Sequence, residues 1–274
     1  MPELPEVETI KRILEPQLRA AVILSVHVHQ ENIIAHPTAE GFAQSIQGRT
    51  LVSMGRRGKF LLFYLDNGGR LVLHLRMTGQ ILAAPKEFPA EKHTHVVMEL
   101  SNGLELRYID PRRFGRFWYI APAETDTFTG LHRLGVEAGS GELSAAYLKT
   151  KLKNRKKPIK DMLHDQSVVA GIGNIYSDEI LFDAGLYPKK SCHTLSDAEW
   201  ERLAISIPKI IAWGIQCDAM TPEEYLAGKG KEYRNTPHLQ VYGREHTPCS
   251  RCSSEIQRLV LNGRSSHYCP VCQQ

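Results

Sequence analysis

The sequence predicts an α+β protein, in which an N-terminal helix and a β-sandwich precede a helical domain and a cysteine-rich ribbon. Apolar residues recur at helical spacing at the start, alternate as in strands up to residue 130, and then return to helical spacing. Four of the six cysteines form two pairs at the C-terminal end. These changes divide the chain into expected domains at 1–130, 144–235 and 236–274, with a linker at 131–143 inside a stretch, 121–144, that is rich in Pro, Thr, Gly and Ser.

The first domain is expected to begin with one helix, because Val7, Ile10, Leu14 and Leu18 share a helical face. Alternating apolar residues then predict strands, with hairpin-type turns between them such as Asn102-Gly103. Short strands with few helices are typical of a sandwich or a barrel. The expected strands are 22–30, 51–65, 71–76, 95–100, 104–109 and 116–120.

The second domain is expected to be helical over 148–163, 173–184 and 196–213. Ser196 and Glu199 form a capping-box pattern at the start of the last helix. Pro208 should kink or interrupt that helix, because proline lacks a backbone N–H.

The net charge of +4 is mildly basic, but its distribution is uneven. Seven basic residues and no acidic residue lie between Lys149 and Lys160. Such a block suits phosphate binding and equally suits a solvated helix face or a linker. No apolar run is long enough to cross a bilayer, and the first residues lack a secretion signal, so a cytosolic location is expected.

The paired cysteines predict a structural zinc site. Cys249-x-x-Cys252 and Cys269-x-x-Cys272 are separated by sixteen residues, which is a spacing typical of four-cysteine zinc ribbons. Four thiolates close the coordination of the metal, so it would hold the shape of the ribbon and perform no chemistry.

The stretch between the cysteine pairs predicts a hairpin, with strands at 256–261 and 264–268 joined by Asn262-Gly263. Arg264 would then project from the tip of this hairpin. An arginine in such a place is either simply solvated or, in a nucleic-acid binder, a phosphate contact.

The start of the chain offers a nucleophile. Removal of the methionine before Pro2 would leave a secondary amine at the new terminus. A neutral amine can attack C1′ of a sugar and form a Schiff base. Glu3 would serve as general acid–base, and Glu6 would bind Pro2 or the sugar. Taken alone, the same residues fit an ordinary first helical turn, where Pro and Glu are common.

The features combined resemble the bacterial formamidopyrimidine-DNA glycosylase family. Pro2–Thr9 is similar to the N-terminal motif of that family, and the ribbon is similar to its zinc ribbon. The resemblance covers nearly the whole chain. Between these ends, the chain resembles the family's lysine loop at 56–60, its two wedge loops at 74–79 and 110–115, its helix–two-turn–helix DNA motif at 168–176 and the lead into the ribbon at 241–244.

This resemblance implies a bifunctional glycosylase and lyase for formamidopyrimidine and 8-oxoguanine lesions. The enzyme would flip the damaged base out of duplex DNA, attack its sugar with Pro2 and cleave the strand by β,δ-elimination. One structural zinc ion is implied, with damaged double-stranded DNA as the partner. The resemblance also implies a monomer in the bacterial cytoplasm, associated with the nucleoid.

The resemblance also implies a role for each matching residue. Glu3 is the acid that assists base departure and ring opening, and Lys59 and Arg264 promote β- and δ-elimination. Asn174, Lys156 and His93 contact the DNA backbone, Met77, Arg112 and Phe114 fill the gap left by the flipped nucleotide, Arg112 reads the orphaned cytosine, and His74 and Tyr242 belong to DNA-binding motifs.

Base flipping gives a physical reason for these residue types. Extrusion of a nucleotide loses stacking, which an inserted apolar wedge partly replaces. Taken singly, Met77 would also suit a core and Phe114 an ordinary strand. The glycine-rich turn before Asn174 would place backbone N–H groups at a helix N-terminus, which suits a phosphate.

The stretch after Trp213 departs from the family, whose members carry a flexible Gly- and Thr-rich loop that closes over oxidised purines. Here Thr221, Pro222 and Glu224 form a helix-start signal. We expect a shorter or more ordered lid, with a weak preference for 8-oxoguanine and retained action on ring-opened purines.

Two other functions fit parts of the sequence. An endonuclease VIII-like glycosylase for oxidised pyrimidines usually has glycine where Leu4 stands, and the wedge residues also disfavour it. A catalytically silent nucleic-acid-binding protein would use the ribbon and the helical motif alone. The intact set of Pro2, Glu3 and Lys59 disfavours this second alternative.

Overall fold

The computed structural model describes residues 2–231 and 234–274, so the expected removal of Met1 concerns a residue outside the described part. The described residues divide into two compact units. The N-terminal unit holds Pro2, Glu6–His132 and 219–231. The C-terminal unit holds Glu3–Pro5, Arg133–Asp218 and Arg234–Gln274. Helix α1 (Leu4–Leu18) therefore begins in one unit and continues in the other.

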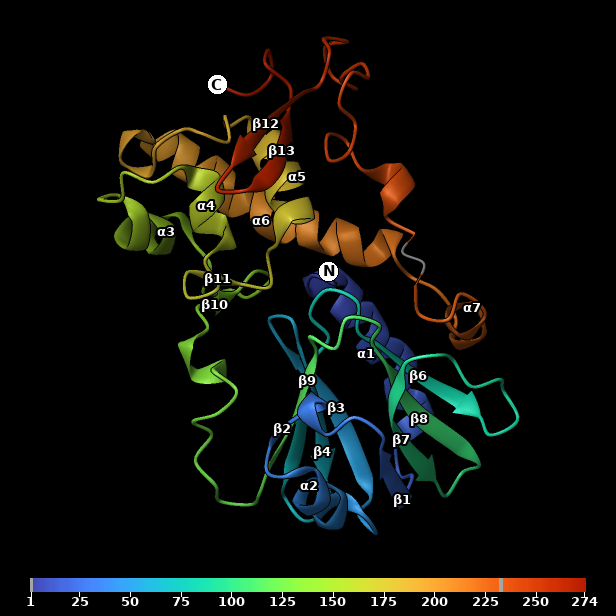
Figure 1. Ribbon diagram of the computed structural model, residues 1–274. Helices are drawn as coiled ribbons and strands as arrows, with labels where there is room; N and C mark the ends of the chain where they lie inside the picture. Colours follow the sequence, from blue (N-terminus) through green and yellow to red (C-terminus); the bar gives the residue numbers. More distant parts are fainter. Residues whose placement is uncertain (1, 232–233) are drawn as a thin grey trace. The chain divides into compact units, whose positions relative to one another are not determined.

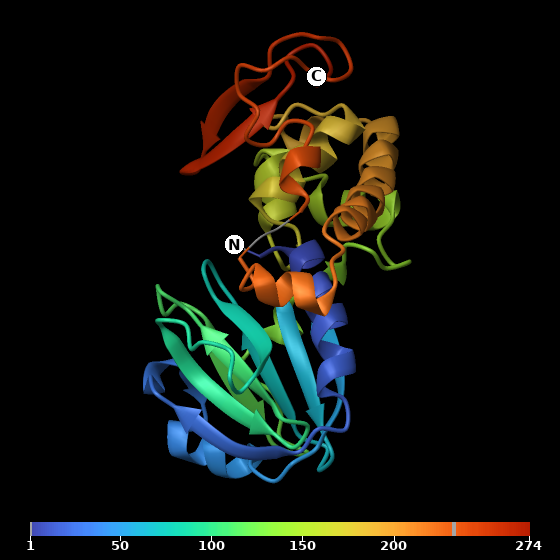
Figure 2. The ribbon, with the colours of Figure 1, turned by 90° about the vertical axis from the view of Figure 1, so that its right-hand side faces the viewer.

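The N-terminal unit is a sandwich of two sheets, which face each other in Figure 2. Among its described residues, one sheet has the order β1-β7-β8-β6 and the other β2-β9-β5-β4-β3. Paired strands are antiparallel except β2 and β9. The strands are β1 (Ile23–Val28), β2 (Ile34–His36), β3 (Leu51–Arg57), β4 (Phe60–Leu65), β5 (Arg70–His74), β6 (Gln80–Pro85), β7 (Thr94–Leu100), β8 (Leu104–Ile109) and β9 (Arg116–Ile120).

The core of this unit lies between the sheets and under α1. Alternate residues of β4 and β5, such as Leu61, Phe63 and Leu71, belong to this core, because successive side chains of a strand point to opposite faces. The strand expected over 51–65 is instead β3 and β4, joined by a turn in which Gly58 has a φ of +54°. Strands β2 and β6 and helix α2 (Ala39–Ile46) were not expected. The side chains of β6 are buried on both faces as far as Ala84, so the strand has no alternation to detect.

The C-terminal unit is helical and carries the cysteine ribbon. Helix α5 lies against both α6 and the ribbon hairpin in Figure 1. Its residues Tyr176–Phe182 are all buried. The remaining elements are α3 (Ala145–Leu152), α4 (Ile159–His164), α5 (Asn174–Ala184), α6 (Asp197–Cys217), the parallel pair β10 (Val136–Glu137) and β11 (Val169–Ala170), and the hairpin β12 (Gln257–Leu261) and β13 (Arg264–Tyr268).

The structure divides one expected helix in two and does not interrupt another at its proline. The helix expected over 148–163 is divided into α3 and α4, with Pro158 at the N-cap of α4, because proline cannot donate the hydrogen bond that would continue α3. Helix α6 runs without interruption through Pro208. The segment expected as a linker contains β10 and a 3₁₀ turn at Leu131–Arg133.

The predicted helix start after α6 is confirmed. Helix α7 (Pro222–Ala227) begins at Thr221, which with Glu224 forms a complete capping box. By its contacts α7 belongs to the N-terminal unit, where it packs on β6. Among the described residues, no helix has both the length and the apolar character needed to span a membrane.

Candidate active site and metal centre

Glu3 caps the N-terminus of α5. Its carboxylate is 2% exposed and accepts hydrogen bonds from the backbone N–H groups of Gly173, Ile175 and Tyr176, at 2.8, 2.9 and 3.2 Å. A Cβ at position 173 would lie only 2.3 Å from the Glu3 side chain, so only glycine permits this approach. The backbone donors that the sequence suggested for a phosphate therefore bind the carboxylate of Glu3.

In the N-terminal unit, Arg56 connects α1 to the turn that carries Lys59. Its Nε donates to Glu8 Oε2 at 3.0 Å, and its Nη1 donates to the Gly58 carbonyl at 3.0 Å. Burial raises the pKa of Glu8, but hydrogen bonds from Arg56 and Arg12 outweigh this effect, so the pKa lies below its ordinary value. Glu8 thus stays ionised, and the conformation of the Gly58–Lys59 turn is held from α1. Sequence reasoning did not assign this role to Arg56.

His74, at the end of β5, is a neutral hydrogen-bond acceptor. Burial lowers the pKa of His74 to about 3, and the positive charges of Arg76 and Lys59 lower it further. The backbone N–H of Arg76 donates to His74 Nδ1 at 3.0 Å, which requires that this nitrogen carry no proton. Lys59 is also buried, and its positive charge is one of those that lower the pKa of His74.

Asp110 joins the two predicted wedge loops. Its fully buried carboxylate accepts hydrogen bonds from Thr78 Oγ1 at 2.5 Å, from Tyr108 Oη at 3.0 Å, and from the backbone N–H groups of Arg112 and Gly115 at 3.1 and 2.9 Å. Burial raises the pKa of Asp110, but these donors outweigh that effect and the pKa lies below its ordinary value. Sequence reasoning missed this residue as a site organiser, although an Asp-Pro pair at a strand end was a turn signal.

The wedge residues project from these loops. Met77 and Phe114 are 45% and 47% exposed, which is unusual for large apolar side chains. The guanidinium of Arg112 lies over the Phe114 ring, 4.6 Å from its centroid, so these two side chains are brought together. His93 is half-buried with a φ of +71°, and its carbonyl accepts the Asp110 N–H at 3.1 Å.

In the C-terminal unit, Lys156 and Arg264 are exposed, and Asn174 and Tyr242 are half-buried. Arg264 follows the Asn262-Gly263 turn, whose positive φ values of +47° and +76° suit a tight hairpin. Asn174 Nδ2 donates to the carbonyl of Ser265 at 3.1 Å, so the first residue of α5 lies beside the tip of this hairpin.

The four paired cysteines form one cluster. Their sulfur atoms all lie within 4.8 Å of one another, with Sγ–Sγ distances of 3.9 Å for Cys249–Cys272 and 3.4 Å for Cys252–Cys269. Four thiolates at about 2.3 Å from one tetrahedral zinc ion would be about 3.8 Å apart. The residues therefore fit a four-cysteine zinc site that joins the two ends of the ribbon.

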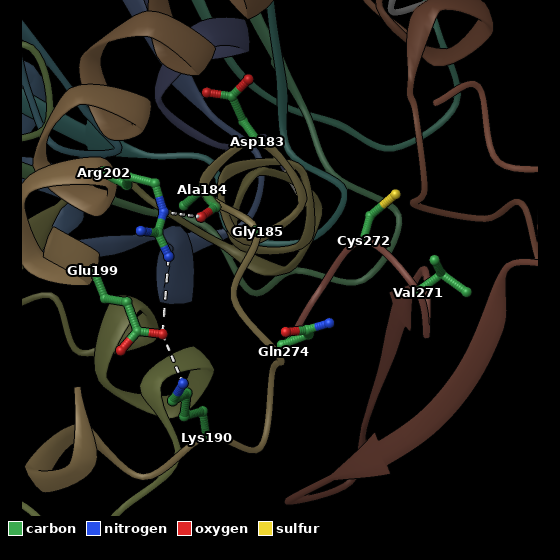
Figure 3. Close-up of a pocket in the computed structure, with 9 residues that line it drawn as sticks. All are labelled: Asp183, Ala184, Gly185, Lys190, Glu199, Arg202, Val271, Cys272 and Gln274. Atoms are coloured by element: carbon green, nitrogen blue, oxygen red, sulfur yellow. Dashed lines mark hydrogen bonds and ion pairs between the residues drawn. The ribbon is translucent and has the colours of Figure 1, made fainter. Parts of the chain in front are cut away.

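A surface pocket of about 510 Å³ lies elsewhere in the C-terminal unit, at the end of α5. Its wall is a chain of paired groups, in which Glu199 binds Lys190 and Arg202, and Arg202 Nε donates to the Ala184 carbonyl (Figure 3). Of the predicted site residues, only Cys272 lines this pocket. The pocket is therefore separate from the predicted catalytic and DNA-contacting residues.

Models of known protein families match three consecutive parts of the chain. These are the formamidopyrimidine-DNA glycosylase N-terminal domain at residues 1–117, the H2TH domain of formamidopyrimidine-DNA glycosylase at 134–225 and a zinc finger found in FPG and IleRS at 248–274. The chain belongs to the formamidopyrimidine-DNA glycosylase family. The expected family, α+β fold, zinc ribbon and enzyme class are thereby confirmed.

Relatives of this glycosylase match over nearly their full length. The formamidopyrimidine-DNA glycosylase of Moorella thermoacetica is 45% identical over 94% of each chain. A Lactococcus lactis FPG in complex with FAPY-dG-containing DNA has a TM-score of 0.90 at 34% identity, covering 99% of this chain and 100% of that one. Another complex of the same enzyme, with DNA containing an oxidised pyrimidine, has a TM-score of 0.90 at 34% identity over 100% of both chains.

Removal of zinc should unfold the ribbon. Chelation at neutral pH is expected to abolish hairpin structure around Arg264, because the ribbon has few buried apolar side chains to replace the metal. Elemental analysis should give one zinc per chain, and circular dichroism should report the loss of structure. The variant Cys269→Ser should lose the metal, whereas Cys217→Ser should retain it. Full zinc content in the Cys269 variant would contradict the assignment.

The buried His74 should make the N-terminal unit sensitive to acid. Its pKa is 6.5 in the unfolded chain and about 3 in the folded one, so stability falls as pH decreases from 6.5 towards 3. The loss is at most about 1.4 kcal/mol per pH unit. The variant His74→Asn, which keeps an acceptor for Arg76, should lose less stability between pH 7 and 5 in denaturant titrations. The exposed control His29→Asn should behave as wild type; equal pH slopes for all three proteins would refute this account.

Proposed function

We propose that this glycosylase excises ring-opened and oxidised purines from duplex DNA and then cleaves the strand, with Pro2 as its nucleophile. The placement of Glu3 carries this proposal. Its buried carboxylate is held by three backbone N–H groups, directly after the residue whose amine would react. A catalytic carboxylate needs such a fixed position, because proton transfer requires hydrogen-bond reach to the reacting group.

In the proposed reaction, the lone pair of the Pro2 nitrogen attacks C1′, and the glycosidic bond breaks with its electron pair on the departing base, which takes up a proton. The Pro2 nitrogen then gives up its N–H proton, its lone pair forms an iminium with C1′ as the C1′–O4′ bond opens, and O4′ receives that proton through Glu3. Loss of a C2′ proton expels the 3′ phosphate, and loss of a C4′ proton expels the 5′ phosphate. Water finally releases the sugar remnant from Pro2.

Lys59 and Arg264 support the two eliminations. Lys59 is buried in the turn that Arg56 holds, so its ammonium has a defined place for phosphate contact and β-elimination. Arg264 is exposed at the hairpin, where a guanidinium fork suits a phosphate and would assist δ-elimination. Asn174, Lys156 and His93 are proposed as further contacts to the DNA backbone. His74 and Tyr242 are proposed as DNA-binding residues, and Glu6 as a residue that binds Pro2 or the sugar.

Met77, Arg112 and Phe114 would enter the space of the flipped nucleotide. Their exposure and the Asp110 hydrogen bonds support this role, since the loops are rigid while the tips remain accessible. Arg112 would donate to the acceptor edge of the orphaned cytosine. Damaged duplex DNA is the proposed partner of a monomeric enzyme that acts in the cytoplasm at the nucleoid.

The lid is proposed to weaken the preference for 8-oxoguanine. Tyr225 of α7 is buried, and its hydroxyl donates to the Ile81 carbonyl at 3.1 Å. Glu91 binds Lys229 at 2.6 Å and Lys231 at 3.6 Å, so the segment after α7 is also tied to the sandwich. A segment held in this way is less able to rearrange over a lesion than a free loop.

The nucleophile can be tested by borohydride trapping on abasic DNA. A protein with an N-terminal extension should give no trapped adduct, because the Pro2 nitrogen is then an amide without an available lone pair. Mass spectrometry should show that Met1 is absent from the active protein. The variant Glu3→Gln should still trap on abasic DNA but excise an intact lesion at least about 100-fold more slowly. Full activity of the extended protein would overturn the proposal.

Lesion preference can be tested on matched duplexes with the lesion opposite cytosine. The wild type should excise a ring-opened purine faster than 8-oxoguanine. Tyr225→Phe should raise the relative rate on 8-oxoguanine by up to about fivefold, because one hydrogen bond of about 1 kcal/mol no longer holds the lid. Tyr64→Phe, at a tyrosine that is 40% exposed, is the control and should change nothing. A strong wild-type preference for 8-oxoguanine would show the lid hypothesis to be wrong.

A further inference from the structure

The last lysine of the basic block does not belong to a solvated face. Lys160 is 1% exposed in α4, whereas Lys151, Lys153 and Lys156 of the same block are exposed. Its Nζ lies 2.6 Å from Oδ1 of Asp178 in α5, whose side chain is fully buried. The basic block therefore contributes one member of a buried ion pair, and composition alone does not distinguish this lysine from the exposed ones.

This ion pair reaches the ribbon hairpin beside Arg264. Lys160 Nζ donates to the carbonyl of Ser265 at 3.0 Å, the same oxygen that accepts from Asn174 Nδ2. Asp178 Oδ2 accepts the backbone N–H of His267 at 2.9 Å. The two members of the pair thus bind the backbone of β13 at Ser265, directly after Arg264, and at His267.

The other side of Arg264 is also held. Asn262 Nδ2 donates to Asp161 Oδ2 at 2.6 Å, and Asp161 follows Lys160 in α4. The guanidinium of Arg264 is exposed, but the backbone on both sides of this residue is hydrogen-bonded to α4 and α5. Because a hairpin tip would otherwise move freely, these contacts determine where the guanidinium can reach.

Stability alone is a weak reason for such a pair. Burial lowers the pKa of Lys160, and the negative charges of Asp178, Glu3 and Asp161, which face it, oppose that shift. Replacing a buried ion pair by apolar residues is often neutral or stabilising, since both charges lose their hydration. A fixed geometry, however, needs directional contacts that apolar packing cannot supply.

We propose that Lys160 and Asp178 are positioning residues, which place Arg264 for its phosphate contact and for δ-elimination by holding β13 at Ser265 and His267. They act through the hairpin backbone and do not touch DNA. This inference rests on the proposed function of Arg264.

The test measures the ratio of δ- to β-elimination products on abasic DNA. In Lys160→Met and in Asp178→Asn, the ratio should fall by at least about tenfold, because small displacements of a catalytic group have large effects on rate. Borohydride trapping, which depends on Pro2, should remain near the wild-type level. Arg264→Gln gives the reference for complete loss of δ-elimination, and Lys153→Met, at an exposed lysine of the same block, should leave the ratio unchanged.

Zinc content and circular dichroism establish that each variant is folded. The double variant Lys160→Met/Asp178→Asn removes both charges and should regain thermal stability without regaining the product ratio, which a purely structural pair would not predict. Should a single variant fail to fold, Lys160→Arg, which keeps the charge but moves the donor, should still lower the ratio. An unchanged ratio in folded, zinc-loaded variants would overturn the inference, whereas the absence of trapping by the wild type would instead overturn the proposed function.

Discussion

The C-terminal unit depends on buried carboxylates that join helix α5 to other segments through backbone N–H groups. Glu3 accepts three backbone N–H groups at its N-terminus, Asp178 accepts the N–H of His267, and Glu179 accepts those of Gln240, Val241 and Tyr242 at 2.9 Å each. Burial raises the pKa of Glu179, and the three backbone donors oppose this effect. Burial of a carboxylate without hydrogen-bond donors costs free energy. The start of the chain, residues 240–242 and β13 are therefore each held at one position against α5.

Asp110 applies the same principle in the N-terminal unit. It is fully buried, and its donors come from both wedge loops. The loops need rigidity because their tips, Met77 and Phe114, expose large apolar side chains to solvent in the free protein. A wedge that was already ordered would lose less entropy when it enters DNA.

The two units therefore share a pattern in which exposed reactive or contacting side chains stand on backbones that buried polar groups hold. Arg264 stands on β13, and Arg112 stands on the loop that Asp110 organises. The exposed side chain would contact DNA, and the buried partner fixes the position of the backbone that carries it. This division explains why the residues that organise the site, such as Asp110 and Asp178, differ from those that motifs identify.

The sequence by itself determined the order of the domains along the chain, the zinc ligands and the hairpin, because these depend on local spacing and turn chemistry. The Thr221 capping box was equally local, and it was predicted correctly. The continuation of α6 through Pro208 and the double-sided burial of β6 were decided by tertiary packing, whereas the break before α4 is a local effect of Pro158. The burial of Lys160 could not be predicted from the sequence either. A basic block does not show which lysine is solvated and which pairs with a carboxylate, and the partner, Asp178, lies eighteen residues away.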